Sequence, residues 1–197
     1  MKSGKLLLAT LGATMLLGIL TASAPAVLST SSQTWRATFR SLTFNGVFGN
    51  ITCEFSIEGS YHSRTINKVV GTLIGYVTRA ILGPCREGRG TVLGEMLPWH
   101  ETYVGFTGTL PNITAYRQFF INGAIRVQEP FAGCLARTSA ANPGVLTFNR
   151  DTSTGAITTA EIGGTVPTSC GVEGSFSSDR GPVTVANSAT RVTLTLI

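Results

Sequence analysis

The feature that most restricts the fold of this chain is a strict alternation of apolar and polar residues from Ile51 to Glu58. The odd-numbered positions of this segment are Ile, Cys, Phe and Ile, and the even-numbered positions are Thr, Glu, Ser and Glu. Successive side chains of a β-strand point to opposite faces, whereas apolar positions on a helix recur every three or four residues. The segment therefore predicts an antiparallel strand with one face in a core and the other in water.

Similar β-branched and aromatic runs recur along the chain, separated by Gly, Asn and Pro, and no long helical pattern interrupts them. Only residues 65–82 are ambiguous, and there we expect a helical turn over 65–69 followed by a strand over 72–82. The pattern predicts an all-β fold of about ten strands, either an antiparallel β-sandwich or an up-and-down β-barrel with two disulfides. Other expected strands cover 34–39, 42–48, 51–61, 91–95, 99–110, 113–128, 145–149, 156–162, 172–176, 183–186 and 191–197.

The N-terminal residues 1–26 have the composition of a secretory signal peptide. Lys2 and Lys5 precede an apolar run over 6–20, which is followed by small residues and Pro up to Ala26. The run has about 15 residues, fewer than the ~20 needed to span a bilayer. We expect cleavage after Ala26, a single all-β domain over 27–197 that begins with a mobile lead over 27–33, and no membrane span in the mature chain. The protein is then extracellular or held in the cell envelope.

The charge pattern argues against nucleic acid as a partner. Only 13% of the residues are charged, and loss of Lys2 and Lys5 lowers the formal net charge from +5 to +3 (5 − 2). The remaining basic residues, all Arg except Lys68, are spread from Arg36 to Arg191 without a cluster that could follow a phosphate backbone.

The chain contains four cysteines, an even number that favours two disulfides in an exported protein. Three pairings exist, and we favour Cys53 with Cys85 and Cys134 with Cys170 because each closes a loop of about 35 residues. Each loop would stabilise the fold by about 3–4 kcal/mol in the chain-entropy model. Because no two cysteines have the C-x2-C spacing of a zinc site, we expect no metal and no cofactor.

Several short motifs span most of the mature chain. They are Cys53, GSYHS at 59–63, LIGYVTRA at 73–80, Cys85, LPWH at 97–100 and GTLP at 108–111. Together these motifs resemble a group of secreted bacterial β-rich proteins of uncharacterised function. The resemblance implies an exported β protein but no activity and no catalytic residue.

The segment from Leu97 to Glu101 combines a rigid turn, an indole, an imidazole and a carboxylate. An exposed Trp99 could stack on a sugar ring or close a pocket, and we select Trp99, His100 and Tyr103 as candidate binding residues. The competing interpretation places Trp99 in the core and His100 in solvent.

Catalytic chemistry has weaker support. His62 lies beside Ser60 and Ser63, but a serine nucleophile also needs an acid to orient its imidazole, and both aspartates, Asp151 and Asp179, occur in turn sequences. No G-x-S-x-G motif is present. The weak catalytic candidates are therefore His62, His100 and Glu101.

Paired carboxylates could instead hydrolyse a glycoside, since residues an even number apart on a strand share a face. Glu95 with Glu101 and Glu54 with Glu58 have that spacing. Exposed faces of soluble sheets commonly carry such pairs, so the spacing alone is weak support for catalysis.

Three functional classes remain. The leading hypothesis is a non-enzymatic secreted protein that binds an apolar small molecule or lipid in a cavity of about 300 Å³ or more, or that meets a cell-surface partner. A secreted hydrolase requires His62 or His100 within hydrogen-bond reach of a hydroxyl or carboxylate. An outer-membrane β-barrel is suggested by alternating Val, Thr and Leu over 192–196, but the missing terminal aromatic residue and the four cysteines disfavour it.

Overall fold

The computed structural model describes residues 27–46, 49–128 and 133–197, so the expected signal peptide at 1–26 lies outside the described residues. Within these ranges the chain forms β-strands and one short 3-10 helix, η1 (Gly94–Met96), which confirms the all-β prediction. The strands are β1 (Leu28–Thr30), β2 (Thr34–Gly46), β3 (Gly49–Tyr61), β4 (Thr65–Ile66), β5 (Leu73–Arg86), β6 (Arg89–Val92), β7 (Trp99–Thr109), β8 (Asn112–Ile121), β9 (Ala124–Gln128), β10 (Gly133–Arg137), β11 (Gly144–Arg150), β12 (Ile157–Pro167), β13 (Glu173–Ser178), β14 (Gly181–Thr184) and β15 (Leu194–Leu196).

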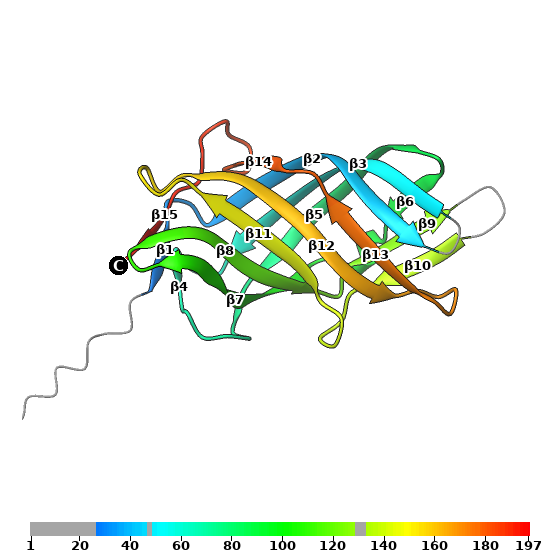
Figure 1. The fold of residues 1–197 in the computed structure, drawn as a ribbon, viewed down its shortest axis with the longest axis horizontal. Coiled ribbons are helices and arrows are strands. Elements are labelled where there is room, and N and C mark those ends of the chain that lie inside the picture. The colour runs from blue at the N-terminus through cyan, green and yellow to red at the C-terminus, as the bar shows by residue number, and fades with distance from the viewer. Residues whose placement is uncertain (1–26, 47–48, 129–132) are drawn as a thin grey trace, which may run out of the picture.

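The large sheet closes on itself (Figure 1). Antiparallel pairings run in chain order through β2, β3, β5, β7, β8, β11, β12 and β13, and β13 pairs again with β2. β14 also pairs with β12 and β2. β13 and β14 thus follow each other along the gap between β12 and β2 and together fill one strand position of the ring. Of the two architectures that the sequence allows, the structure has the up-and-down barrel.

Two small sheets lie at opposite ends of this barrel (Figure 1). One is formed by β15, β1 and β4, and the other by β10, β9 and β6. Residues 27–33 therefore do not form the mobile lead that the sequence predicts: Leu28 is fully buried and pairs with Leu196 and Ile66. The prediction was wrong because the small and polar residues of this segment do not indicate that it pairs with strands that are distant in sequence.

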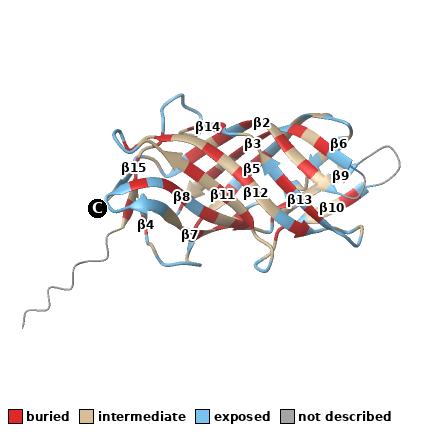
Figure 2. Ribbon diagram, in the orientation of Figure 1, coloured by how far each residue is buried: buried red, intermediate tan, exposed pale blue. Residues whose placement is uncertain are grey.

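The wall has an apolar inner face and a largely polar outer face, and burial alternates along its strands (Figure 2). β3 shows the predicted pattern, with Ile51, Phe55 and Ile57 buried and Glu54 exposed. The expected strands 34–39 and 42–48 are one strand, β2, whose register shifts between Phe39 and Leu42. The predicted helical turn at 65–69 is absent, because Thr65 and Ile66 pair with β1 as β4.

Aromatic rings fill the interior. Trp35 contacts Phe148 edge to face with centroids 5.1 Å apart, and Phe148 stacks on Tyr116 at 6.0 Å. Farther along the barrel, Trp99 stacks on Phe120 at 5.7 Å. The interior is thus a packed core along most of its length rather than an open cavity.

Both predicted disulfides are present. Cys53–Cys85 joins the adjacent wall strands β3 and β5, and Cys134–Cys170 joins β10 to the connection between β12 and β13. Both lie toward the barrel end that carries β6, β9 and β10. No helix in the described part of the chain is long and apolar enough to cross a membrane.

Candidate functional site

The candidate binding residues Trp99 and Tyr103 point into the barrel. Their exposed fractions are 1% and 2%, and Tyr103 stacks on Tyr116 with centroids 5.9 Å apart. Neither ring is therefore available to stack on a sugar at the surface. The structure supports the interpretation that places Trp99 in the core.

His62 and His100 lie on the opposite, outer face of the wall, with Tyr76 between them. The Tyr76 ring is 4.9 Å from the His62 ring and 5.4 Å from the His100 ring, measured between centroids. Neither imidazole forms a side-chain hydrogen bond within the described residues, so Ser60 and Ser63 do not have a base in place. His62, which directly follows β3, forms an aromatic cluster with Tyr76 of β5 and His100 of β7. This arrangement is not that of a nucleophile and its base.

The carboxylate pairs suggested by the sequence are not assembled for glycoside hydrolysis. Glu95 is exposed on η1, whereas Glu101 is fully buried inside the barrel. Glu58 on the outer face forms salt bridges with Arg36 at 2.5 Å and with Arg79 at 3.4 Å. These contacts give Glu58 a structural role in the wall.

Glu101 belongs to a buried polar cluster in the apolar interior. Its Oε1 accepts a hydrogen bond of 2.5 Å from Gln118 Nε2, and the Tyr61 hydroxyl donates to Gln118 Oε1 at 3.3 Å. Glu101 Oε2 and the Tyr116 hydroxyl have no hydrogen-bond partner within the described part of the chain. Such unpaired buried polar atoms are uncommon in folded proteins.

Burial raises the pKa of Glu101 well above its usual range, and the Gln118 hydrogen bond opposes this only in part. No salt bridge among the described residues involves Glu101, so no cation offsets the cost of a buried charge. Burial therefore favours the neutral, protonated form of this side chain more than in an exposed glutamate. Its even spacing from Trp99 and Tyr103 was the sequence signal that could have placed it on the inner face.

Two adjoining cavities lie at the end of the barrel that carries β6, β9 and β10. The outer cavity has a volume of about 50 Å³ and the inner one about 30 Å³. They share four lining residues, one from each of the strands β2, β10, β12 and β13: Phe44, Ala136, Val166 and Phe176. Because these residues line both spaces, we treat the two cavities as one site and call it the end cavity.

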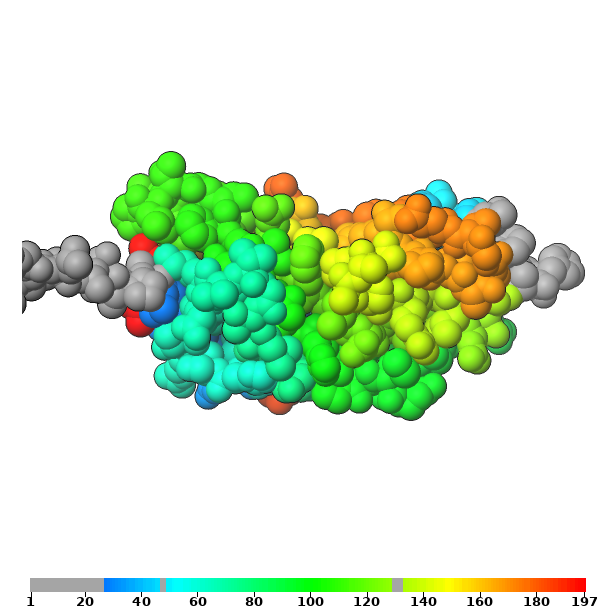
Figure 3. Space-filling model, turned by 90° about the horizontal axis from the view of Figure 1, so that it is seen from below, coloured from blue at the N-terminus to red at the C-terminus, as the bar shows by residue number. Residues whose placement is uncertain are grey.

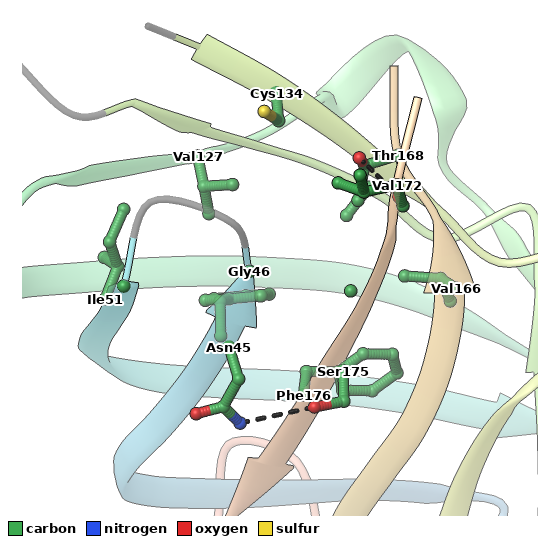
Figure 4. A pocket seen from close by; sticks show the side chains of 14 residues that line it. Asn45, Gly46, Ile51, Val127, Cys134, Val166, Thr168, Val172, Ser175 and Phe176 are labelled. Carbon is green, nitrogen blue, oxygen red and sulfur yellow. Dashed lines mark hydrogen bonds between the residues drawn. The ribbon is translucent and has the colours of Figure 1, made fainter. Parts of the chain in front are cut away.

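The walls of the end cavity are mostly apolar. Figure 4 shows Val127 of β9, Val166 of β12 and Phe176 of β13 around the outer part, and Asn45 Nδ2 donating to Ser175 Oγ at 3.4 Å beside them. Phe55, Trp99 and Phe120 line the inner part. Of the candidate binding residues selected from the sequence, Trp99 lines this site, whereas His100 and Tyr103 do not. Sequence reasoning missed the other lining residues because they are of the types found in an ordinary core.

The small sheet and the wall meet around this site. Ser169 N donates to Leu135 O at 2.9 Å, and Ala136 forms an isolated bridge with Thr168. In the space-filling view the β12–β13 region, orange, lies directly against the yellow-green β10 region (Figure 3). With the Cys134–Cys170 disulfide, these contacts fix the position of β10 over the end of the barrel.

Size decides what this site can hold. A cavity needs a volume of about 10–15 Å³ to hold one water molecule, so each part of the end cavity has room for a group larger than one water. Drug-sized ligands occupy pockets of about 300–1,000 Å³, which is much larger than the end cavity. The site accepts the end of an alkyl chain or one apolar side chain, and it does not meet the 300 Å³ expected for enclosure of a whole small molecule.

The described residues contain no group of three or more His, Cys, Asp or Glu side chains that could hold a metal ion. No known protein family, curated protein or solved structure matches the chain. The resemblance to secreted bacterial β-rich proteins therefore stays a prediction.

Proposed function

We propose that this chain is an exported, non-enzymatic binding protein that holds the apolar end of a ligand in the end cavity. The single observation that supports this most directly is the joined apolar space between β2, β10, β12 and β13. An apolar group that enters this mostly apolar space gains dispersion contacts with the cavity walls.

Export is part of the proposal. Two disulfides are compatible with an oxidising compartment, since cytosolic proteins seldom keep them. Both disulfides brace the barrel end that contains the cavity, where a rigid wall lowers the cost of ordering on binding. A binding function thus explains why the covalent links occur at this end.

The other two classes have less support. A hydrolase needs an activated nucleophile, and both imidazoles lie on the outer face without a hydroxyl or carboxylate partner in the described residues. An outer-membrane barrel needs an apolar outer band, whereas β2 and β3 present Arg36, Thr38, Arg40, Thr52, Glu54, Ser56 and Glu58 outward.

The test uses 1-octanol as an apolar probe and backbone amide NMR shifts of the mature protein as the readout. We expect saturable shifts at residues that line the end cavity, including Val166 and Phe176. Ala136→Leu should fill the shared space and weaken binding about tenfold or more, whereas Ala141→Leu, the same change at an exposed turn, should leave binding unchanged. Shifts that fail to saturate, or that are equal in Ala136→Leu, would refute the proposal.

A further inference from the structure

The inner part of the end cavity contains one charged residue. Arg137, the last residue of β10, is exposed and lines the cavity together with apolar side chains such as Phe55, Phe120 and Ile125. No Asp or Glu lines either part of the end cavity within the described residues. The cavity therefore joins an apolar interior to one positive charge at its solvent side.

The guanidinium of Arg137 has no anionic partner within the described part of the chain. Salt bridges there involve Arg36, Arg79 and Arg180, and the one side-chain hydrogen bond of Arg137 among the described residues is a 4.0 Å contact of Nη2 with Met96 Sδ. A thioether is a weak acceptor, so the five N–H donors of the guanidinium remain free to bind a stronger one. Planar oxyanions such as carboxylates match this donor geometry best.

Arg137 thus favours a ligand that carries oxygen acceptors next to its apolar part.

From these observations we infer that the ligand is an anionic amphiphile, an alkyl chain that ends in a carboxylate. Its terminal carbons fill the end cavity and its carboxylate binds the Arg137 guanidinium. This inference rests on the proposed function and adds the chemical class of the ligand. A neutral alkyl ligand is the alternative, and the test below distinguishes the two.

The experiment compares octanoate with 1-octanol, which have the same chain length and differ in the charge of the head group. Dissociation constants are measured by NMR titration below the micelle concentration for the wild-type protein, Arg137→Gln and Arg126→Gln. Arg126 is the matched control, because it is exposed on the neighbouring strand β9 and does not line the cavity.

We expect octanoate to bind the wild-type protein about tenfold more tightly than 1-octanol. Arg137→Gln should weaken octanoate binding about tenfold and leave 1-octanol binding unchanged, and Arg126→Gln should affect neither by more than twofold. Raised salt should weaken octanoate binding alone.

Each contrary outcome identifies what fails. If both probes bind equally and Arg137→Gln changes neither, the ligand class is wrong and the proposed function stands. If Arg126→Gln weakens octanoate as much as Arg137→Gln, the effect is general charge attraction and the assignment of Arg137 is overturned. If neither probe binds with saturation, both the inference and the proposed function are refuted.

Discussion

Replacement of Glu101 by Gln should change the pH dependence of stability in a way that only a buried neutral carboxyl explains. In the unfolded chain a glutamate titrates near pH 4.3. In the folded protein, full burial without a cation raises the pKa of Glu101 well above that range. Between these two pKa values the folded state keeps a proton that the unfolded state has lost. The unfolding free energy is therefore unaffected by this group below about pH 4.3 and falls as the pH rises above it.

The magnitude follows from the linkage relation. The limiting slope for one proton is about 1.4 kcal/mol per pH unit, and partial protonation of the unfolded chain at pH 5 lowers the change between pH 5 and pH 6 to about 1.2 kcal/mol. Glu101→Gln removes the titrating group and can keep the hydrogen bond from Gln118. The stability of Glu101→Gln relative to the wild-type protein should thus rise by about 1.2 kcal/mol over that interval.

Urea unfolding at pH 5 and pH 6, followed by tryptophan fluorescence, measures this difference. Glu54→Gln is the control, since Glu54 is exposed on the outer face and forms no salt bridge among the described residues. Its stability relative to the wild-type protein should be the same at both pH values. An equally constant difference for Glu101→Gln would mean that the folded protein tolerates the buried charge, and the argument for a neutral Glu101 would be wrong.

Three further predictions concern the wall, a disulfide and a turn. Gly75→Ala should lower the unfolding free energy by about 1–3 kcal/mol in urea titrations, because its Cβ would lie 2.4 Å from a backbone carbonyl oxygen of β3, whereas Gly105→Ala has no atom within 4 Å and should be tolerated. Replacement of both cysteines of the β10 disulfide by serine should cost about 3–4 kcal/mol by the same assay, and no loss would show that the loop is already ordered in the unfolded chain. The Asp151 carboxyl should titrate at about pH 2 by NMR, because the Ser153 hydroxyl and the amide and hydroxyl of Thr154 donate to it. Its contribution to stability is present above about pH 4 and is lost as the pH falls to about 2; a normal midpoint would contradict the turn geometry.

Local patterns in the sequence predicted much of the barrel wall. Alternation over 51–58 identified β3 and its buried face, and equal loop lengths identified both disulfide pairs. Closure of the ring was not predictable, since the pairing of β13 with β2 depends on contacts between segments from opposite ends of the described chain. The same holds for β1, whose partners β4 and β15 carry no local signal.

The candidate site was harder to predict than the fold. Trp99, His100 and Tyr103 stand out by residue type, yet strand alternation divides them between the two faces of the wall. The end cavity arises instead from ordinary residues such as Ala136 and Val166, whose importance depends on what lies opposite them in space. A sequence reports residue types, but it does not report where a core leaves space unfilled.

The ring of wall strands closes without β6, β9 or β10, which enter the chain as two insertions between wall strands and form their own three-stranded sheet. The sequences of β6, β9 and β10 can thus change without a change in the pairing of the wall strands. On the proposed binding function, libraries restricted to β9 and β10 should alter ligand preference while the wall strands keep their register.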